Sequence, residues 1–320
     1  MTASIRDGVR LAARHPRLVC LLWAWYGLLA LVPALPAWRW WNGVLGSSPE
    51  AASVLTRFDL GVFLDLVSTQ GVNGLGLLAG AAMAVAVIAL VSSAFAFGGI
   101  LEVFGSEGEP RTFMHRFFRG GGHFFWRYLR LALIAGVCLV LATGAVSAFM
   151  TGATAPLRES EWEPAGYLLG MANLGVLLTV AALFLLALDY ARIRVSRDDA
   201  RSMLKAYASG LGFVLRRFVP AYGIAIPFAG ALAVLVILYL AYETTTPAAG
   251  NWGAIALLFL VQQFVVVGRV FLRVGLVGAE RHFHIWALPT PVPAAVTEII
   301  APESPASDVP VPSEVEQIPT

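Results

Sequence analysis

Six long apolar runs, separated by segments that carry arginine, are the feature that most constrains the fold of this chain. A helix that crosses a bilayer needs about 20 apolar residues, because lipid offers the backbone no hydrogen-bond partner. The six runs lie approximately at residues 18–37, 75–97, 130–150, 167–188, 218–241 and 252–272. The pattern predicts an all-α, polytopic membrane protein with six transmembrane helices.

Composition agrees with this class and excludes others. The chain is 58% hydrophobic and 13% charged, unlike an average soluble protein. A formal net charge of +2 argues against general nucleic-acid binding. Lys205 is the only lysine among 22 basic residues, which is typical of a GC-rich bacterial genome. We therefore expect the bacterial inner membrane, with Cys20 and Cys138 as free thiols inside spans.

The distribution of basic residues predicts the orientation. Nineteen of them lie in the N-terminal segment, in alternate connections and after the last run, against three on the other side, namely Arg39, Arg57 and Arg158. Basic residues favour the cytoplasmic side of a membrane. The split predicts six spans with both the N- and the C-terminus in the cytoplasm.

Three amphipathic segments precede spans, at about residues 4–15, 111–127 and 197–216. Gly8, Gly121 and Gly210 can be aligned so that Arg14, Arg127 and Arg216 each follow six residues later. We interpret this as three hairpin modules, each made of a cytoplasmic surface helix, a span and a return span. A chance match in a chain rich in arginine and glycine is the alternative.

Basic side chains on these surface helices are candidate contacts for lipid or a partner protein. They are Arg14, Arg116, Arg119, Arg127, Arg201, Lys205, Arg216 and Arg217. Each cytoplasmic charge near a span attracts anionic headgroups by about 1 kcal/mol. The alternative is that these residues only set the topology and extend toward the interface.

The sequence divides into a transmembrane domain, residues 1–287, and a tail, residues 288–320. Eight of the 18 prolines lie in the tail, with five acidic residues and no basic ones. Such a composition cannot bury enough apolar area to fold alone, so we expect a disordered cytoplasmic tail. Val296, Ile299 and Ile300 belong to its one apolar cluster and are the candidate docking residues.

Polar residues inside the spans are few. No Asp, Glu, Lys, Arg or His lies at the centre of a run, which counts against a proton relay. Gln262 and Gln263 form the strongest polar signal, about 15 Å deep at the helical rise of 1.5 Å per residue. They either line a path for a solute or join helices by hydrogen bonds.

Motifs for catalysis or cofactor binding are not found. Glu280, His282 and His284 could be imagined as a metal site, but helical residues two apart do not share a face. The sequence has no nucleotide-binding loop, nucleophile elbow or zinc signature. We expect no enzyme activity, no metal and no cofactor.

Two stretches carry a family resemblance: DYARIRV at 189–195 and QQFVVVGRVFLRVG at 262–275. With the repeated surface helix and span, the chain resembles a loose group of uncharacterised polytopic bacterial membrane proteins. These are similar to the membrane domain that precedes some glycerophosphodiester phosphodiesterases. The resemblance implies fold and location; no soluble stretch is long enough for the phosphodiesterase domain.

The sequence thus predicts a non-enzymatic integral membrane scaffold or accessory subunit of a bacterial membrane complex. It would organise anionic lipids or partner proteins through its basic surface helices and its tail. The alternative is a facilitator or transporter of a small amphipathic or lipid-like solute, with Gln262 and Gln263 on its path. Oligomeric state is left open.

Overall fold

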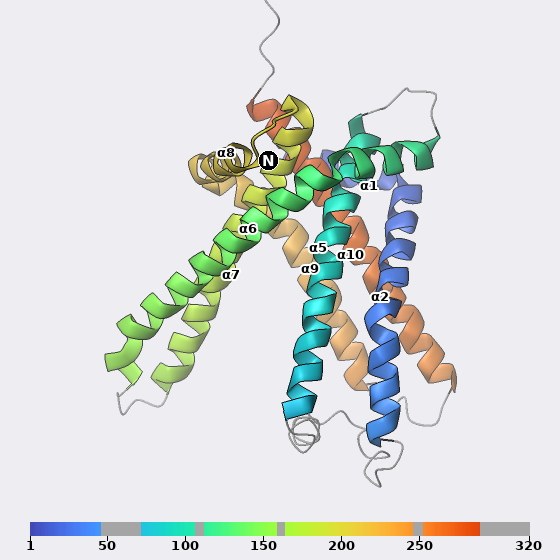
Figure 1. The fold of residues 1–320 in the computed structure, drawn as a ribbon, viewed down its shortest axis with the longest axis vertical. Coiled ribbons are helices and arrows are strands. Elements are labelled where there is room, and N and C mark those ends of the chain that lie inside the picture. Colours follow the sequence, from blue (N-terminus) through green and yellow to red (C-terminus); the bar gives the residue numbers. More distant parts are fainter. Residues whose placement is uncertain (46–71, 106–111, 159–163, 246–251, 289–320) are drawn as a thin grey trace, which may run out of the picture. The chain divides into compact units, whose positions relative to one another are not determined.

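The computed structural model describes residues 1–45, 72–105, 112–158, 164–245 and 252–288. Over these residues the chain forms eight helices and no strand (Figure 1). They are α1 (Thr2–Arg14), α2 (Pro16–Leu45), α5 (Val72–Gly105), α6 (Phe113–Arg158), α7 (Pro164–Asp198), α8 (Met203–Arg216), α9 (Phe218–Thr245) and α10 (Trp252–Ala287).

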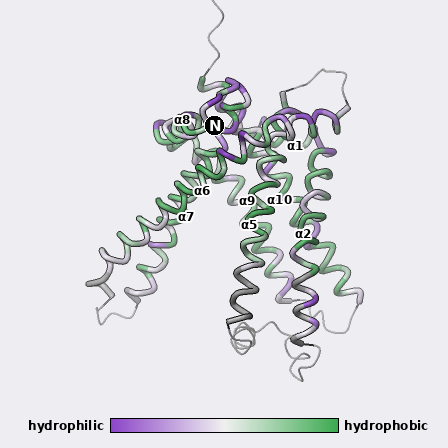
Figure 2. Tube along the Cα trace, in the orientation of Figure 1, coloured by the Kyte–Doolittle hydropathy of each residue, from purple (hydrophilic) through white to green (hydrophobic). Residues whose placement is uncertain are grey.

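Six of these helices are long and apolar enough to cross a membrane. The qualifying stretches are Pro16–Leu35, Gly80–Gly105, Phe113–Thr154, Gly166–Asp198, Phe218–Thr245 and Trp252–Ala287. Figure 2 shows hydrophobic residues along these helices and hydrophilic residues gathered where α1 and α8 are drawn. The prediction of an all-α protein with six helices of transmembrane length is confirmed.

Two of the three predicted surface segments form separate helices. α1 ends at Arg14, and α2 begins at Pro16, whose missing N–H costs nothing at a helix start. α8 is preceded by Ser202, whose hydroxyl accepts a hydrogen bond from the Lys205 N–H, and a break at Arg217 separates it from α9. The middle segment, predicted at residues 111–127, differs, because α6 continues from Phe113 into the span without a break. No proline or capping residue stands between the two predicted parts to end the helix.

Three helices also extend well past the apolar runs seen in the sequence. α5 continues beyond residue 97 to Gly105, α7 beyond residue 188 to Asp198 and α10 beyond residue 272 to Ala287. Hydropathy detects only the apolar part of a helix, whereas arginine and glutamate are good helix formers. The extensions carry most of the charged residues described below.

The hydrophobic core lies at one end of the spans. Buried side chains gather near the starts of α2 and α9, in the first half of α6 and near the ends of α5, α7 and α10. Together with α1 and α8, these parts carry most of the basic residues, and we call them the arginine-rich end. At the opposite ends Phe149 is 73% exposed and Trp252 84% exposed. The alternation of start and end along the chain is what helices crossing in alternate directions produce.

Glycines hold α1, α6 and α8 against the ends of spans. A methyl group on Gly8 of α1 would lie 2.8 Å from Cβ of Ala279 on α10. On Gly210 of α8 it would lie 2.6 Å from the Ala187 carbonyl oxygen on α7. Both distances are shorter than van der Waals contact, so these positions require glycine.

The middle surface segment makes the same contact through a different glycine from the one aligned in the sequence. A methyl group on Gly120 would lie 2.7 Å from the Gly98 carbonyl oxygen on α5 and would also overlap Glu102. Gly121 instead lies over the Phe95 ring. The contact glycine is therefore one residue before the glycine aligned in the sequence, and six residues after Gly120 stands Trp126, not an arginine.

Glycine substitutions on α8 test this packing. Gly210→Ala should lower the free energy of unfolding by about 1–3 kcal/mol, because the added methyl overpacks the contact with α7. Gly212→Ala is the matched control, because nothing lies within 4 Å of its added methyl. The control should be neutral or stabilising by up to about 1 kcal/mol from helix propensity. Thermal unfolding in detergent measures both, and equal effects of the two variants would contradict the packing.

Candidate functional site

A pair of charged residues joins α7 to α10 at the arginine-rich end. Arg273 donates two hydrogen bonds to Asp189, from Nη1 to Oδ2 at 2.8 Å and from Nη2 to Oδ1 at 2.9 Å. The Asp189 side chain is only 6% exposed, whereas that of Arg273 is 42% exposed. A planar guanidinium that binds both carboxylate oxygens fixes orientation as well as distance.

Arg192 extends this pair to two more helices. It lies one turn beyond Asp189 on α7 and is 3% exposed, with Nη1 3.5 Å from Oδ1 of Asp189. Its Nη2 donates to Ser93 Oγ of α5 at 3.4 Å, and its guanidinium lies 5.0 Å from the centroid of the Phe97 ring. Its carbonyl oxygen accepts a hydrogen bond from Tyr128 Oη of α6 at 3.0 Å. The cluster therefore contacts α5, α6, α7 and α10.

Glu280 of α10 is the fourth charged member. It is fully buried and lies within electrostatic range of Asp189, Arg192 and Arg273. When ionised it balances the cluster at two carboxylates and two guanidiniums, which makes burial of the charges tolerable. Within the described part of the chain neither carboxylate oxygen has a hydrogen-bond partner. The site thus offers acceptor oxygens to water or to another donor.

Two more buried polar atoms lie beside Glu280. Tyr190 and His284 are stacked, with ring centroids 6.2 Å apart, and both rings contact Phe213 of α8. Tyr190 Oη and His284 Nδ1 have no hydrogen-bond partner among the described residues. Buried polar atoms of this kind usually bind ordered water.

Two further ion pairs surround the cluster at the surface. Arg119 of α6 pairs with Glu102 of α5, and Arg127 of α6 pairs with Asp199 in the connection between α7 and α8. The Arg127 guanidinium holds the pKa of the Asp199 carboxyl below its usual value. Both pairs are partly exposed, so each contributes little to stability on its own.

The predicted lipid- or partner-contact residues fall into two groups. Arg14, Arg201, Lys205 and Arg216 are exposed. Arg119 and Arg127 pair within the chain, Arg116 is half-buried, and half-buried Arg217 lies 5.1 Å from the Phe213 ring centroid. The first four are therefore the ones available to an external anion.

The two glutamines of α10 do not share one environment. Gln263 accepts a hydrogen bond from Trp23 Nε1 of α2 at 3.0 Å, so it joins two helices. Gln262 is exposed. For Gln263 the geometry matches the interhelical interpretation of the sequence.

The two C-terminal histidines contact different helices. His282 Nδ1 lies 3.1 Å from Ser4 Oγ, and its Nε2 lies 3.5 Å from Asp7 Oδ2, both on α1. His284 faces α7 and α8 instead. Among the described residues no three His, Cys, Asp or Glu side chains come together as metal ligands would. The candidate tail residues Val296, Ile299 and Ile300 lie outside the described residues.

The charge cluster itself was missed by sequence reasoning. Sequence reasoning treated Arg192 and Arg273 only as basic residues that set the topology. It considered Glu280 only as a possible metal ligand. One signal was available: Asp189 and Arg192 are three apart and therefore share a helix face. That spacing could not reveal the pairing between α7 and α10, because Asp189 and Arg273 are 84 positions apart.

Comparison with protein-family models, with curated proteins and with solved structures finds no match to this chain.

Replacing Asp189 tests the cluster. Asp189→Asn should lower the free energy of unfolding by about 3 kcal/mol, because it removes the ion pairs that Asp189 makes with buried Arg192 and with Arg273. Thermal or denaturant unfolding in detergent measures this. The double variant Asp189→Asn with Arg192→Gln should recover part of the loss, because it also removes the uncompensated charge.

Asp198→Asn is the matched control for this test. Asp198 also pairs with an arginine on α7, at 3.3 Å from Arg194, but both side chains are more than 40% exposed, at 47% and 43%. The control should cost less than about 1 kcal/mol. Equal losses in Asp189→Asn and Asp198→Asn would contradict a buried, structure-determining cluster.

Proposed function

We propose that the protein is a non-enzymatic membrane scaffold or accessory subunit that organises anionic lipids or partner proteins at its arginine-rich end. One observation carries the proposal: the helices that pack their glycine faces on the ends of the spans leave basic side chains exposed. This supports placing that end at the cytoplasmic face of a bacterial inner membrane.

α1 provides the first example. Its buried residues Ser4, Gly8 and Ala12 recur every four positions and form one face. Arg6, Arg10 and Arg14 also recur every four positions, lie on the opposite face and are exposed. A single amphipathic helix therefore both anchors itself to α10 and presents three positive charges.

α8 repeats the arrangement. Its buried face holds Met203, Ala206, Tyr207, Gly210 and Val214. Lys205 and Arg216 lie opposite and are exposed, and the apolar Leu204 and Leu215 are 65% and 55% exposed beside them. A helix with basic and apolar exposed stripes suits the boundary between headgroups and hydrocarbon.

The repeated contact supports the three-module interpretation as part of this proposal. In each case a glycine packs against two residues four apart on a span: Gly8 on Gly275 and Ala279, Gly120 on Gly98 and Glu102, Gly210 on Ala187 and Ala191. In two cases the span immediately precedes the surface helix. In the remaining case α1 packs on α10, the last helix, so the three contacts close a cycle.

The alternative function is a facilitator or transporter of a small amphipathic or lipid-like solute. Glu280 favours it, because a buried carboxyl group whose oxygens have no hydrogen-bond partner among the described residues is costly in a candidate span and is usually kept for function. The hydrogen bond of Gln263 to Trp23 favours a structural role for that amide. If Gln262→Leu with Gln263→Leu leaves uptake and export in cells unchanged, those glutamines do not line a path.

Neutralising the exposed basic residues tests the scaffold proposal. The variant Arg14→Gln, Arg201→Gln, Lys205→Gln, Arg216→Gln should lose its preference for phosphatidylglycerol over phosphatidylcholine by at least about tenfold. Native mass spectrometry of protein released from mixed nanodiscs measures the retained lipids. Added salt should weaken the preference of the unmodified protein, because exposed charges are screened.

Arg119→Gln with Arg127→Gln is the control, because both arginines already pair with carboxylates of the chain. It should lower the preference much less. The proposal fails if the unmodified protein shows no preference for anionic lipid and also purifies from its native membrane without a stoichiometric protein partner.

A further inference from the structure

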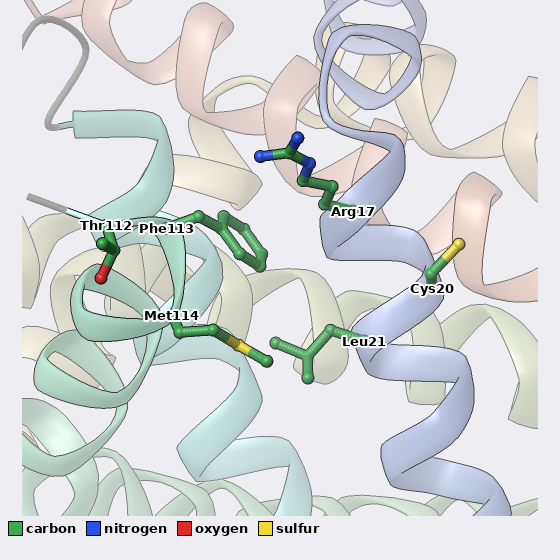
Figure 3. Close-up of a pocket in the computed structure, with 6 residues that line it drawn as sticks. All are labelled: Arg17, Cys20, Leu21, Thr112, Phe113 and Met114. Carbon is green, nitrogen blue, oxygen red and sulfur yellow. The ribbon is translucent and has the colours of Figure 1, made fainter.

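A hollow of about 500 Å³ lies between the first turns of α2 and the start of α6. Arg17, Cys20 and Leu21 of α2 line one side, and Thr112, Phe113 and Met114 line the other. Figure 3 shows Arg17 reaching toward Phe113 and Leu21 pointing toward Met114. The hollow belongs to the arginine-rich end, because both helices begin there.

The lining divides into a polar and an apolar part. Arg17 and Thr112 supply a guanidinium and a hydroxyl, whereas Leu21, Phe113 and Met114 are apolar. Leu21 stands one helical turn further into the span than Arg17. A ligand that fits must therefore be anionic at the surface and apolar toward the membrane interior.

No carboxylate among the residues that line the hollow balances the charge of Arg17. None of the six lining residues is acidic, and the first turn of α6 contains no acidic residue either. Among the described residues that line the hollow, the positive end of the α6 dipole therefore adds to the guanidinium and no carboxylate offsets it. An anionic ligand complements both charges.

We infer that this hollow binds one anionic phospholipid, with its phosphate at Arg17 and an acyl chain along Leu21 and Met114. The inference rests on the proposed lipid-organising function and gives it a defined site. Free phosphate fits less well, because it leaves the apolar wall exposed to water. The position at the start of a span is where a bilayer supplies phospholipid headgroups.

Two variants of the full chain test the site by independent routes. Arg17→Gln removes the charge and should lower phosphatidylglycerol binding about fivefold. Leu21→Trp changes no charge but fills the hollow and should lower binding as well. Leu28→Trp is the matched control, because Leu28 lies on the same helix, is 66% exposed and does not line the hollow. Native mass spectrometry from phosphatidylglycerol–phosphatidylcholine nanodiscs gives the occupancy, and thermal unfolding checks that each variant folds.

The outcomes separate this inference from the broader function. Loss in Arg17→Gln and Leu21→Trp with none in Leu28→Trp supports the site. Unchanged phosphatidylglycerol binding in Arg17→Gln overturns the site but leaves the scaffold function standing. No lipid preference in the unmodified protein overturns both. Full displacement of the lipid by soluble glycerol phosphate overturns the phospholipid assignment in favour of a soluble anion.

Discussion

The ion pair between Asp189 and Arg273 is the interaction on which the arginine-rich end depends. An unpaired charge buried among apolar helices costs several kcal/mol, so α7 and α10 must meet where the two side chains can bond. Arg192 and Glu280 then bring the cluster to two positive and two negative charges when all are ionised. Because Arg192 also donates to Ser93 of α5 and accepts a hydrogen bond from Tyr128 of α6 at its carbonyl oxygen, the cluster joins four helices.

Glycine contacts complete this end by a different physical means. At Gly8, Gly120 and Gly210 the absence of a side chain lets a helix approach a span closely enough for backbone contact. The glycines of α1 and α8 thereby turn the opposite, basic faces of these helices outward. Arginines at this end take different roles. Arg127 and Arg192 pair within the chain, while Arg14 and Arg216 remain exposed. The proposed lipid function concerns only the exposed group.

How far sequence reasoning reached can be judged from particular residues. The apolar runs located the six span-length helices. The sequence alignment used Gly121, whereas the close contact with the α5 backbone and Glu102 is made by Gly120, because three consecutive glycines give the sequence no means to choose among them. Gln263 could be given two roles from sequence, and the structure adds a hydrogen bond from Trp23 that the sequence did not predict. The hollow at Arg17 was not foreseen, because its two walls are nearly 100 residues apart in a 320-residue chain.

By itself the sequence determined the class of protein: helical, with six segments long and apolar enough to cross a membrane, and with its basic residues at alternate ends. Those properties follow from local composition, since a backbone in lipid must satisfy its hydrogen bonds within each segment. Only the tertiary structure decided which charges are buried and paired, which glycines make close contacts and which arginines stay exposed. These depend on contacts between residues such as Asp189 and Arg273 or Gly8 and Gly275, which lie far apart in the chain and which no local pattern relates.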